Sequence, residues 1–136
     1  MDVLGGWDWP AGPKSVWGPV GWRWLHLTAI YYPRAPCPAD AQRAAVRLRA
    51  FLARLPCAEC RWHAARYLHH DPPALSGSEA FRVWTWRFHN AVNARLGHRL
   101  IPYAECRGLY AADIRWADWA SGAGARQPSA SAWAPA

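Results

Sequence analysis

Proline divides this chain into helix-length segments, and no other feature of the sequence constrains the fold as tightly. Breaks fall at Pro33 to Pro36, at Pro56, at Pro72 and Pro73, and, with a glycine in place of proline, at Gly97. The segments between them repeat apolar residues every three or four positions. No segment alternates apolar and polar residues for long enough to predict a strand. The pattern predicts an all-α fold, a bundle of four helices with short connections and a short fifth helix.

Start and stop signals place the five expected helices. Pro19 suits the first turn of a helix, Ser78 suits an N-cap and Gly97 suits a C-cap. The expected ranges are 17–32, 41–55, 56–70, 78–97 and, from the spacing of Tyr103, Cys106, Tyr110 and Ile114, 103–114. The core stripe of the fourth helix is expected to be Phe81, Trp84, Phe88, Val92 and Leu96.

The length of 136 residues fits one compact domain. We expect residues 1–13 to form an irregular lead-in, 14–119 to form the working domain, and 120–136, rich in Ala, Ser, Gly and Pro, to form a disordered tail. Eleven tryptophans exceed what a core of this size requires. This excess favours a site that holds a flat ligand.

The chain has sixteen Lys plus Arg against nine Asp plus Glu, a formal net charge of +7. The arginines are scattered over several expected helices, which favours a solvated basic surface over a nucleic-acid-binding tract. No stretch approaches the roughly 20 apolar residues of a membrane span, and the N-terminus lacks the basic start and apolar core of a secretory signal. We therefore expect no nucleic-acid partner, no membrane span and no secretion by the standard route.

Cys57 and Cys60 form a C-x-x-C pair at the expected start of the third helix. Arg61 stands where covalent haem attachment requires a histidine, and a thioredoxin-like motif requires a strand before the helix. A redox pair fits better, because a helix N-terminus with Arg61 and His63 nearby favours a reactive thiolate.

Two expected helices each present a tryptophan, a histidine and small or amide residues on one side, since spacings of three and four align side chains on a helix. Aromatic rings stack on flat groups, amides pair with ring donors and acceptors, and an arginine can bind phosphate. The pattern favours a nucleotide-bearing redox cofactor. The residues are Gly18, Trp22 and His26 on the first helix, and Trp86, His89, Asn90, Asn93 and Arg95 on the fourth.

Four stretches occur in the order of a known family. They are 17–26 (WGPVGWRWLH), 31–33 (YYP), 55–63 (LPCAECRWH) and 89–97 (HNAVNARLG). Together they cover most of the expected domain and closely resemble the Erv/ALR family of FAD-linked sulfhydryl oxidases.

The resemblance implies a four-helix bundle with a short fifth helix, FAD at the mouth of the bundle, and a homodimer. It implies a thiol oxidase in which Cys57 exchanges disulfides with dithiols of client or shuttle proteins, such as thioredoxin-like or small Cys-pair proteins. Cys60 would face the flavin, and FAD would pass electrons to O2, giving hydrogen peroxide. No metal is expected.

The resemblance also implies which residues bind the cofactor. The eight residues of the two helix faces match family positions that line FAD. Four more match through a looser alignment near the chain ends: Lys14, His98, Tyr110 and Trp116.

One departure from the family concerns the remaining cysteines. Trp86 stands where cellular members carry the first cysteine of a structural disulfide, so Cys106 lacks its usual partner. Cys37 and Cys106 could pair, link two subunits, relay electrons or stay reduced. Cys37 lies between the first and second expected helices, and Cys106 lies between the fourth and fifth or inside the fifth. An up-and-down bundle tends to put these segments at opposite ends, which disfavours a disulfide between the two cysteines.

The small size, and the lack of both a cysteine-bearing shuttle extension and the usual structural disulfide, make the chain similar to short versions encoded by large DNA viruses. This implies the cytoplasm of an infected host cell, and the virion, as locations; a non-viral protein would be intracellular.

Two other classes of protein stay open from the residues. One is a small zinc-stabilised basic helical module that binds nucleic acid, with Cys57, Cys60, His63 and either His69 or His70 as ligands. The other is a protein-interaction bundle with two inert, buried cysteines.

Overall fold

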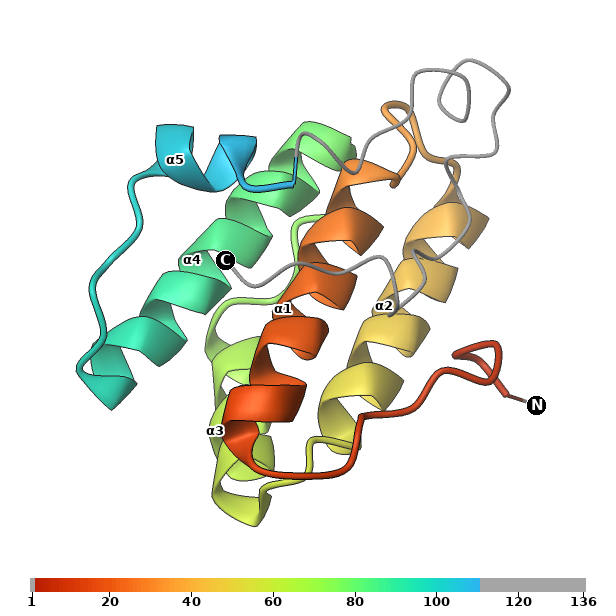
Figure 1. The fold of residues 1–136 in the computed structure, drawn as a ribbon. Helices are drawn as coiled ribbons and strands as arrows, with labels where there is room; N and C mark the ends of the chain where they lie inside the picture. Colours follow the sequence, from red (N-terminus) through yellow and green to blue (C-terminus); the bar gives the residue numbers. More distant parts are fainter. Residues whose placement is uncertain (1, 111–136) are drawn as a thin grey trace.

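The computed structural model describes residues 2–110, which form five helices and no strand. The predicted all-α fold, with four long helices and a short fifth, is confirmed (Figure 1). Ile114, Trp116, the predicted domain end at 119 and the predicted tail at 120–136 lie outside the described residues. The helices are α1 (Lys14–Ile30), α2 (Pro38–Ala53), α3 (Ala58–His70), α4 (Ser78–Leu96) and α5 (Tyr103–Gly108).

Helix α1 begins earlier than the sequence predicts. Pro13 is its N-cap, with a φ of −71°, and the helix starts at Lys14, so Pro19 lies inside the helix rather than in its first turn. An interior proline removes one backbone hydrogen bond and costs about 3 kcal/mol. Burial of side chains such as Trp24 offsets this cost, because packing supplies most of the stability of a helix in a protein.

The other helix ends match the predicted signals only in part: α2 begins at Pro38, before the predicted start at residue 41, and α5 ends at Gly108, before the predicted end at residue 114. Cys37 caps α2: its backbone N–H donates to Asp40 Oδ2 at 2.9 Å, and its sulfur accepts from the backbone N–H of Asp40. Gly77, rather than Ser78, is the N-cap of α4. The predicted C-cap at Gly97 is confirmed, with a left-handed φ of 74° that glycine adopts without strain.

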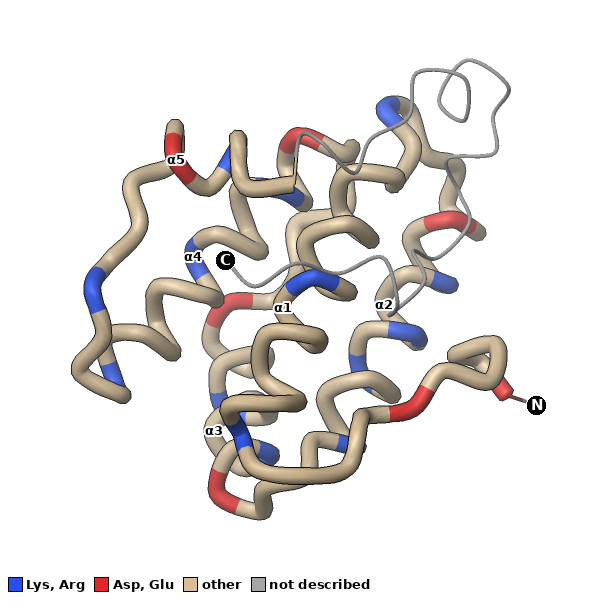
Figure 2. Tube along the Cα trace, in the orientation of Figure 1, with Lys and Arg blue, Asp and Glu red and all other residues tan. Residues whose placement is uncertain are grey.

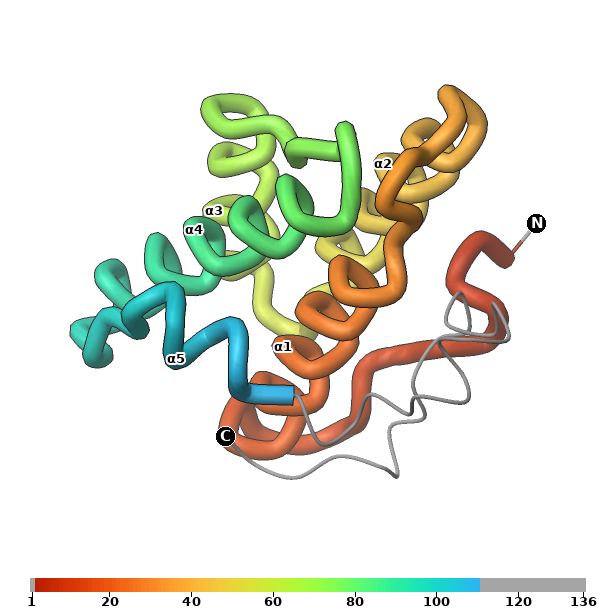
Figure 3. Tube along the Cα trace, turned by 90° about the horizontal axis from the view of Figure 1, so that it is seen from above, coloured from red at the N-terminus to blue at the C-terminus, as the bar shows by residue number. Residues whose placement is uncertain are grey.

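Helix α1 is the central helix of the bundle. It packs along α4 and lies beside α2 on its other side, while α2 packs against α3 and α5 packs against α4 (Figures 1 and 3). The first half of α1, the length of α3 and the second half of α4 consequently face a shared space, which the candidate site occupies.

Aromatic rings fill much of the core. Trp24 stacks on Phe51 with ring centroids 4.0 Å apart, and Trp84 stacks on Phe88 at 5.4 Å. Trp17, Trp24 and Trp84 are all buried. Part of the tryptophan excess therefore serves the packing of the core, so the composition alone was a weak indicator of a flat ligand.

The segment before α1 packs against the bundle although it forms no helix. Leu4 is 1% exposed, and Trp7 and Trp9 pack against the core. The Trp9 indole Nε1 donates to the carbonyl oxygen of Phe51 at 3.0 Å. We refer to residues 2–12 as the N-terminal segment.

Basic residues are spread over several helices and their connections rather than gathered in one tract (Figure 2). This distribution agrees with a solvated basic surface. None of the helices among residues 2–110 combines the length and the apolar character needed to cross a membrane. Several arginines pair with carboxylates: Arg99 with Glu105 at 2.6 Å, Arg107 with Glu79 at 2.6 Å and Arg87 with Asp71 at 3.1 Å.

Candidate functional site

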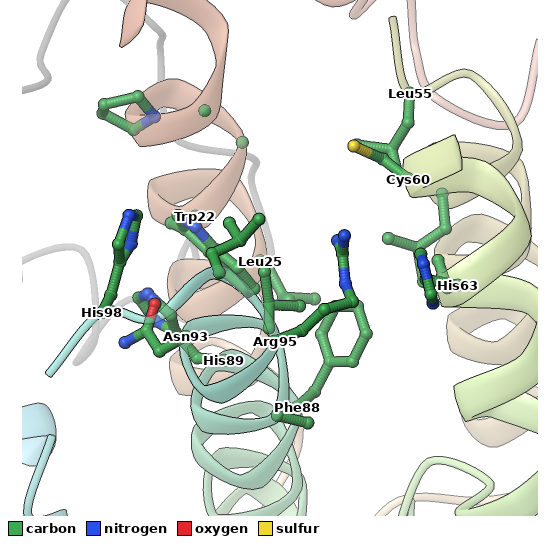
Figure 4. A pocket seen from close by; sticks show the side chains of 18 of the residues that line it. Trp22, Leu25, Leu55, Cys60, His63, Phe88, His89, Asn93, Arg95 and His98 are labelled. Carbon is green, nitrogen blue, oxygen red and sulfur yellow. The ribbon is translucent and has the colours of Figure 1, made fainter. Parts of the chain in front are cut away.

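The main feature of the structure is a cavity of about 870 Å³ between α1, α3 and α4. Its volume lies within the range of about 300–1,000 Å³ that is usual for small-molecule and cofactor sites. The wall is mainly apolar and aromatic, with a few polar groups, as in such sites. Figure 4 shows Cys60 and His63 on one side and Trp22, His89, Asn93 and His98 on the other.

A disulfide joins Cys57 and Cys60 at the start of α3, with the two Cα atoms 5.1 Å apart. Cys57 is the N-cap of the helix, and its sulfur accepts a hydrogen bond from the backbone N–H of Cys60 at 3.2 Å. Cys60 is buried and lines the cavity, whereas Cys57 is half-buried and is not part of the lining. The two sulfurs of one disulfide therefore have different surroundings.

In the reduced state these surroundings shift the pKa values of the two thiols in opposite directions. The hydrogen bond from the Cys60 thiol lowers the pKa of Cys57, and the Cys60 backbone N–H and Lys14 act in the same direction, while burial opposes them. Burial raises the pKa of Cys60, although Lys14 and a hydrogen bond from Arg95 oppose this shift. Cys57 is thus the sulfur that carries negative charge more easily.

A flat aromatic wall lines the part of the cavity formed by α1 and α4. The rings of Trp22 and His89 stack with centroids 3.7 Å apart and planes 7° apart, and Phe88 packs beside Trp22 at 5.6 Å. All three side chains line the cavity. Such a surface suits a flat conjugated ring.

Behind this wall, the buried His26 contacts the buried His89, which belongs to the wall. His26 Nε2 and His89 Nδ1 are 2.8 Å apart, so one ring donates and the other accepts. Burial lowers the pKa of His26 to about 3, with His89 and Arg82 adding to the effect, and burial lowers the pKa of His89 to about 4. Both rings are therefore neutral near pH 7, and the pair fixes the orientation of the His89 ring.

Basic and amide side chains occupy other parts of the lining. Lys14, Arg95, His98 and Arg99 line the cavity together with Asn93, whose amide donates to the Arg99 carbonyl at 3.2 Å. Arginine and lysine side chains are the usual partners of phosphate groups in proteins. The arrangement can therefore hold an anionic group together with a flat ring.

The structure brings most of the residues predicted from the sequence to one cavity. The lining includes Cys60 of the predicted redox pair and eight predicted cofactor residues. Those eight are Lys14, Gly18, Trp22, His89, Asn93, Arg95, His98 and Tyr110.

Three other predicted cofactor residues do not line the cavity. His26 lies behind His89, as described above. Trp86 and Asn90 bind the chain that follows α4: the Trp86 indole N–H donates to the Ile101 carbonyl at 2.6 Å, and the Asn90 amide donates to the same oxygen at 2.9 Å. These side chains support residues of the wall rather than the interior of the cavity. Trp116 lies outside the described residues.

Trp9 and Tyr67 also line the cavity, although the sequence did not indicate either of them as a site residue. Trp9 belongs to the N-terminal segment, where no periodicity exists to indicate which side chain faces inward. Tyr67 lies seven residues after Cys60 on α3, so helical spacing places it on the same face, and this signal could have identified it.

The other two cysteines are free thiols, with Cys37 exposed and Cys106 buried. The disfavoured disulfide between them is absent. Cys106 Sγ lies 3.9 Å from His26 Nδ1, away from the disulfide. Within residues 2–110, no three His, Cys, Asp or Glu side chains gather closely enough to hold a metal ion, and the two cysteines of the alternative zinc set are bonded to each other.

A disulfide at a helix N-terminus, with one sulfur against an aromatic, partly basic cavity in a helical bundle, defines a class of thiol–disulfide redox proteins that hold a flat cofactor. The sequence model of the Erv1 / Alr family matches residues 19–117. The chain belongs to this family, which confirms the resemblance.

Known relatives and solved structures agree with this assignment. The FAD-linked sulfhydryl oxidase of African swine fever virus (isolate Warthog/Namibia/Wart80/1980) is 42% identical over 98 residues, covering 72% of this chain and 82% of its own. A relative from Invertebrate iridescent virus 6 is 38% identical over 101 residues, covering 68% and 89%. The crystal structure of the yeast Erv1 core matches with a TM-score of 0.68 at 22% identity, covering 79% and 92%, which shows a shared fold.

Proposed function

We propose that this chain is an FAD-dependent thiol oxidase in which the Cys57–Cys60 disulfide oxidises dithiols of client or shuttle proteins. The observation that carries the proposal is the position of this disulfide, which has Cys60 in the wall of the aromatic cavity and the less buried Cys57 outside the lining. The viral relative at 42% identity, named as an FAD-linked sulfhydryl oxidase, supports the same activity.

The donor set of the cavity fits FAD. The stacked Trp22 and His89 rings offer a flat surface for the tricyclic ring, and Lys14, Arg95 and Arg99 offer positive charge for the pyrophosphate. Bound there, FAD would accept the electron pair of the reduced cysteines and pass it to O2, which would become hydrogen peroxide.

The residues proposed to hold FAD follow from the lining. They are Lys14, Gly18, Trp22, His89, Asn93, Arg95, His98 and Tyr110. We assign His26, Trp86 and Asn90 to supporting these residues, because each contacts the wall and none lines the cavity.

The surroundings of the two sulfurs set the direction of thiol exchange. A client thiolate attacks Cys57 Sγ, the more accessible of the two sulfurs, forms a mixed disulfide with it and releases Cys60 as the thiolate. Burial raises the pKa of Cys60, and Lys14 and Arg95 oppose this shift. The second client thiolate then attacks the client sulfur of the mixed disulfide and releases Cys57. The lowered pKa of Cys57 makes it a good leaving group in this second step.

The absorbance spectrum of the purified protein tests the proposal. We expect a visible flavin band that is bleached by a dithiol under anaerobic conditions and restored by air, with one hydrogen peroxide formed per dithiol oxidised. Cys57→Ser and Cys60→Ser should each abolish oxygen uptake driven by a dithiol and retain the flavin band. A colourless protein, or unchanged turnover in both variants, would overturn the proposal.

Assembly and location are further parts of the proposal, and family membership and the viral relatives support them. The chain works as a homodimer in the cytoplasm of an infected host cell, with the virion as a second location. Sedimentation analysis tests the dimer, and fractionation of infected cells and purified virions tests the location.

A further inference from the structure

Trp9 lines the cavity although it belongs to the N-terminal segment, which lies before the part of the chain that the family model matches. This segment runs from beside α2 to the start of α1 (Figures 1 and 3). Its only side chain in the wall is that of Trp9.

Four contacts fix the Trp9 ring, the first of them an edge-to-face contact with Trp7 at 5.2 Å and 75°. The ring stacks on Phe51 of α2 with centroids 4.6 Å apart and planes 29° apart, and it meets Trp17 of α1 edge to face at 5.5 Å and 88°. The indole N–H donates to the Phe51 carbonyl at 3.0 Å. Phe51 and Trp17 also line the cavity, so Trp9 completes an aromatic surface between α1 and α2.

Gly21 admits the Trp9 ring against α1. A Cβ atom at position 21 would overlap two carbon atoms of the ring, Cζ3 and Cη2. The backbone of Gly21 does not have a positive φ, so no unusual backbone conformation requires glycine here. A glycine inside a helix costs about 1 kcal/mol relative to alanine. The close approach of the Trp9 ring explains why a glycine stands at position 21 despite this cost.

Trp7 offers a comparison within the same segment. Its ring packs on Trp24 at 5.7 Å, on Phe51 at 5.2 Å and on the edge of Trp9 at 5.2 Å, and it does not line the cavity. Leu4, buried to 1% exposure, further anchors the segment. Trp7 and Leu4 thus attach the segment to the bundle, whereas Trp9 also reaches the cavity.

We propose that Trp9 is part of the flavin site, so that the N-terminal segment completes the cofactor cavity and Gly21 is required for the ring to dock. The inference rests on the proposed function in that the ligand is FAD. The Trp9 ring would contact both the bundle and FAD. FAD binding and docking of the N-terminal segment therefore stabilise each other by the same free energy. FAD therefore makes the segment more rigid, and a displaced Trp9 weakens FAD binding.

The test compares Trp9→Leu with Trp7→Leu in the full-length apoprotein. FAD affinity is measured by titration of flavin fluorescence, and the melting temperature is measured without FAD. We expect Trp9→Leu to weaken FAD binding about 5- to 10-fold through loss of ring contact. Trp7→Leu removes one ring contact of Trp9 but leaves the Trp9 ring held by Phe51 and Trp17, so it should change FAD binding less than about twofold at a comparable loss of melting temperature. Gly21→Ala, which keeps the Trp9 side chain and displaces it, should resemble Trp9→Leu.

Hydrogen exchange gives a second measurement that does not depend on catalysis. FAD should slow amide exchange in residues 3–9 of the wild type and of Trp7→Leu, and should have little effect there in Trp9→Leu. If Trp9→Leu does not fold, Trp9→Phe carries the same comparison, since it keeps a ring and loses the indole donor.

The outcomes separate this inference from the proposed function. A wild-type protein that binds no FAD would overturn both. A wild type that binds FAD, together with unchanged affinity in Trp9→Leu, or with equal losses in Trp9→Leu and Trp7→Leu, would overturn only the role of Trp9.

Discussion

The side chain of Asn90 and the backbone of Ile101 pair through two hydrogen bonds. Asn90 Nδ2 donates to the Ile101 carbonyl at 2.9 Å, and Asn90 Oδ1 accepts from the Ile101 N–H at 2.8 Å. This pair ties α4 to the connection leading to α5, where His98, Arg99 and Ile101 line the cavity. A residue outside the lining thus positions part of the wall.

Asn90→Ala should therefore affect both stability and cofactor binding. Loss of the side chain leaves the half-buried backbone N–H and carbonyl of Ile101 without the Asn90 amide, which costs about 1–3 kcal/mol in the free energy of unfolding. FAD affinity should fall as the connection loosens. Urea unfolding and a flavin titration measure the two effects.

Two further variants control this prediction. Gln42→Ala removes an exposed amide on α2 and should change stability by less than about 0.5 kcal/mol. Trp86→Phe removes one donor to the Ile101 carbonyl and should have a smaller effect than Asn90→Ala. Equal stability of Asn90→Ala and wild type would show that the pair does not hold the connection.

The buried histidine pair predicts how stability depends on pH. Both histidines have a pKa below the ordinary value of 6.5, about 3 for His26 and about 4 for His89, so the unfolded chain binds more protons than the folded protein between about pH 6.5 and 4. Stability is therefore complete above pH 6.5 and falls as the pH decreases through this window. Each histidine contributes at most about 1.4 kcal/mol per pH unit.

Urea unfolding at pH 7.5, 6.5 and 5.5, with free FAD at one concentration, measures this slope. The His26→Gln variant should have a shallower slope than the wild type, since one titrating group is removed. A slope that is the same in both proteins would contradict the prediction that His26 is buried in the neutral form.

The sequence predicted the fold and indicated many residues of the cavity lining, because those features repeat along the chain. Trp22 and His89 lie on helix faces that spacing identifies, and Cys60 follows Cys57 by one helical turn. Trp9 could not be found in this way, since its position depends on Phe51 and on the space above a glycine, both distant in sequence.

The hydrogen-bond partner of Asn90 could not be predicted for a similar reason. Helical spacing places Asn90 beside His89, and the family resemblance supplied a ligand for it. The partner of its amide is a backbone group eleven residues later. The path of an irregular connection leaves no periodic pattern in the sequence.

Alanine substitutions at two glycines, Gly97 at the C-cap of α4 and Gly108 at the end of α5, should affect the free energy of unfolding differently. Gly97 has a φ of +74°, which alanine adopts at a cost of about 1–2 kcal/mol, and open space surrounds its missing Cβ. Gly108, at the end of α5, also has open space and lacks a positive φ. Gly97→Ala should lower the free energy of unfolding by about 1 kcal/mol, and Gly108→Ala should leave it unchanged or raise it by up to about 1 kcal/mol. Similar losses in both variants would mean that strain at Gly97 is not the cause.

The two free cysteines should react at very different rates. Cys37 is exposed, whereas Cys106 is 7% exposed and burial raises its pKa to about 11. Since thiolate and access control thiol reactivity, a disulfide reagent at pH 8 should modify Cys37 quickly and Cys106 only after unfolding. Mass spectrometry of the native and urea-unfolded protein distinguishes the two sites.

Cys106→Ser should keep turnover of a small dithiol close to that of the wild type, because the Cys106 sulfur lies beside His26 and away from the disulfide. A large loss of turnover, at unchanged flavin content and melting temperature, would place Cys106 in the electron path.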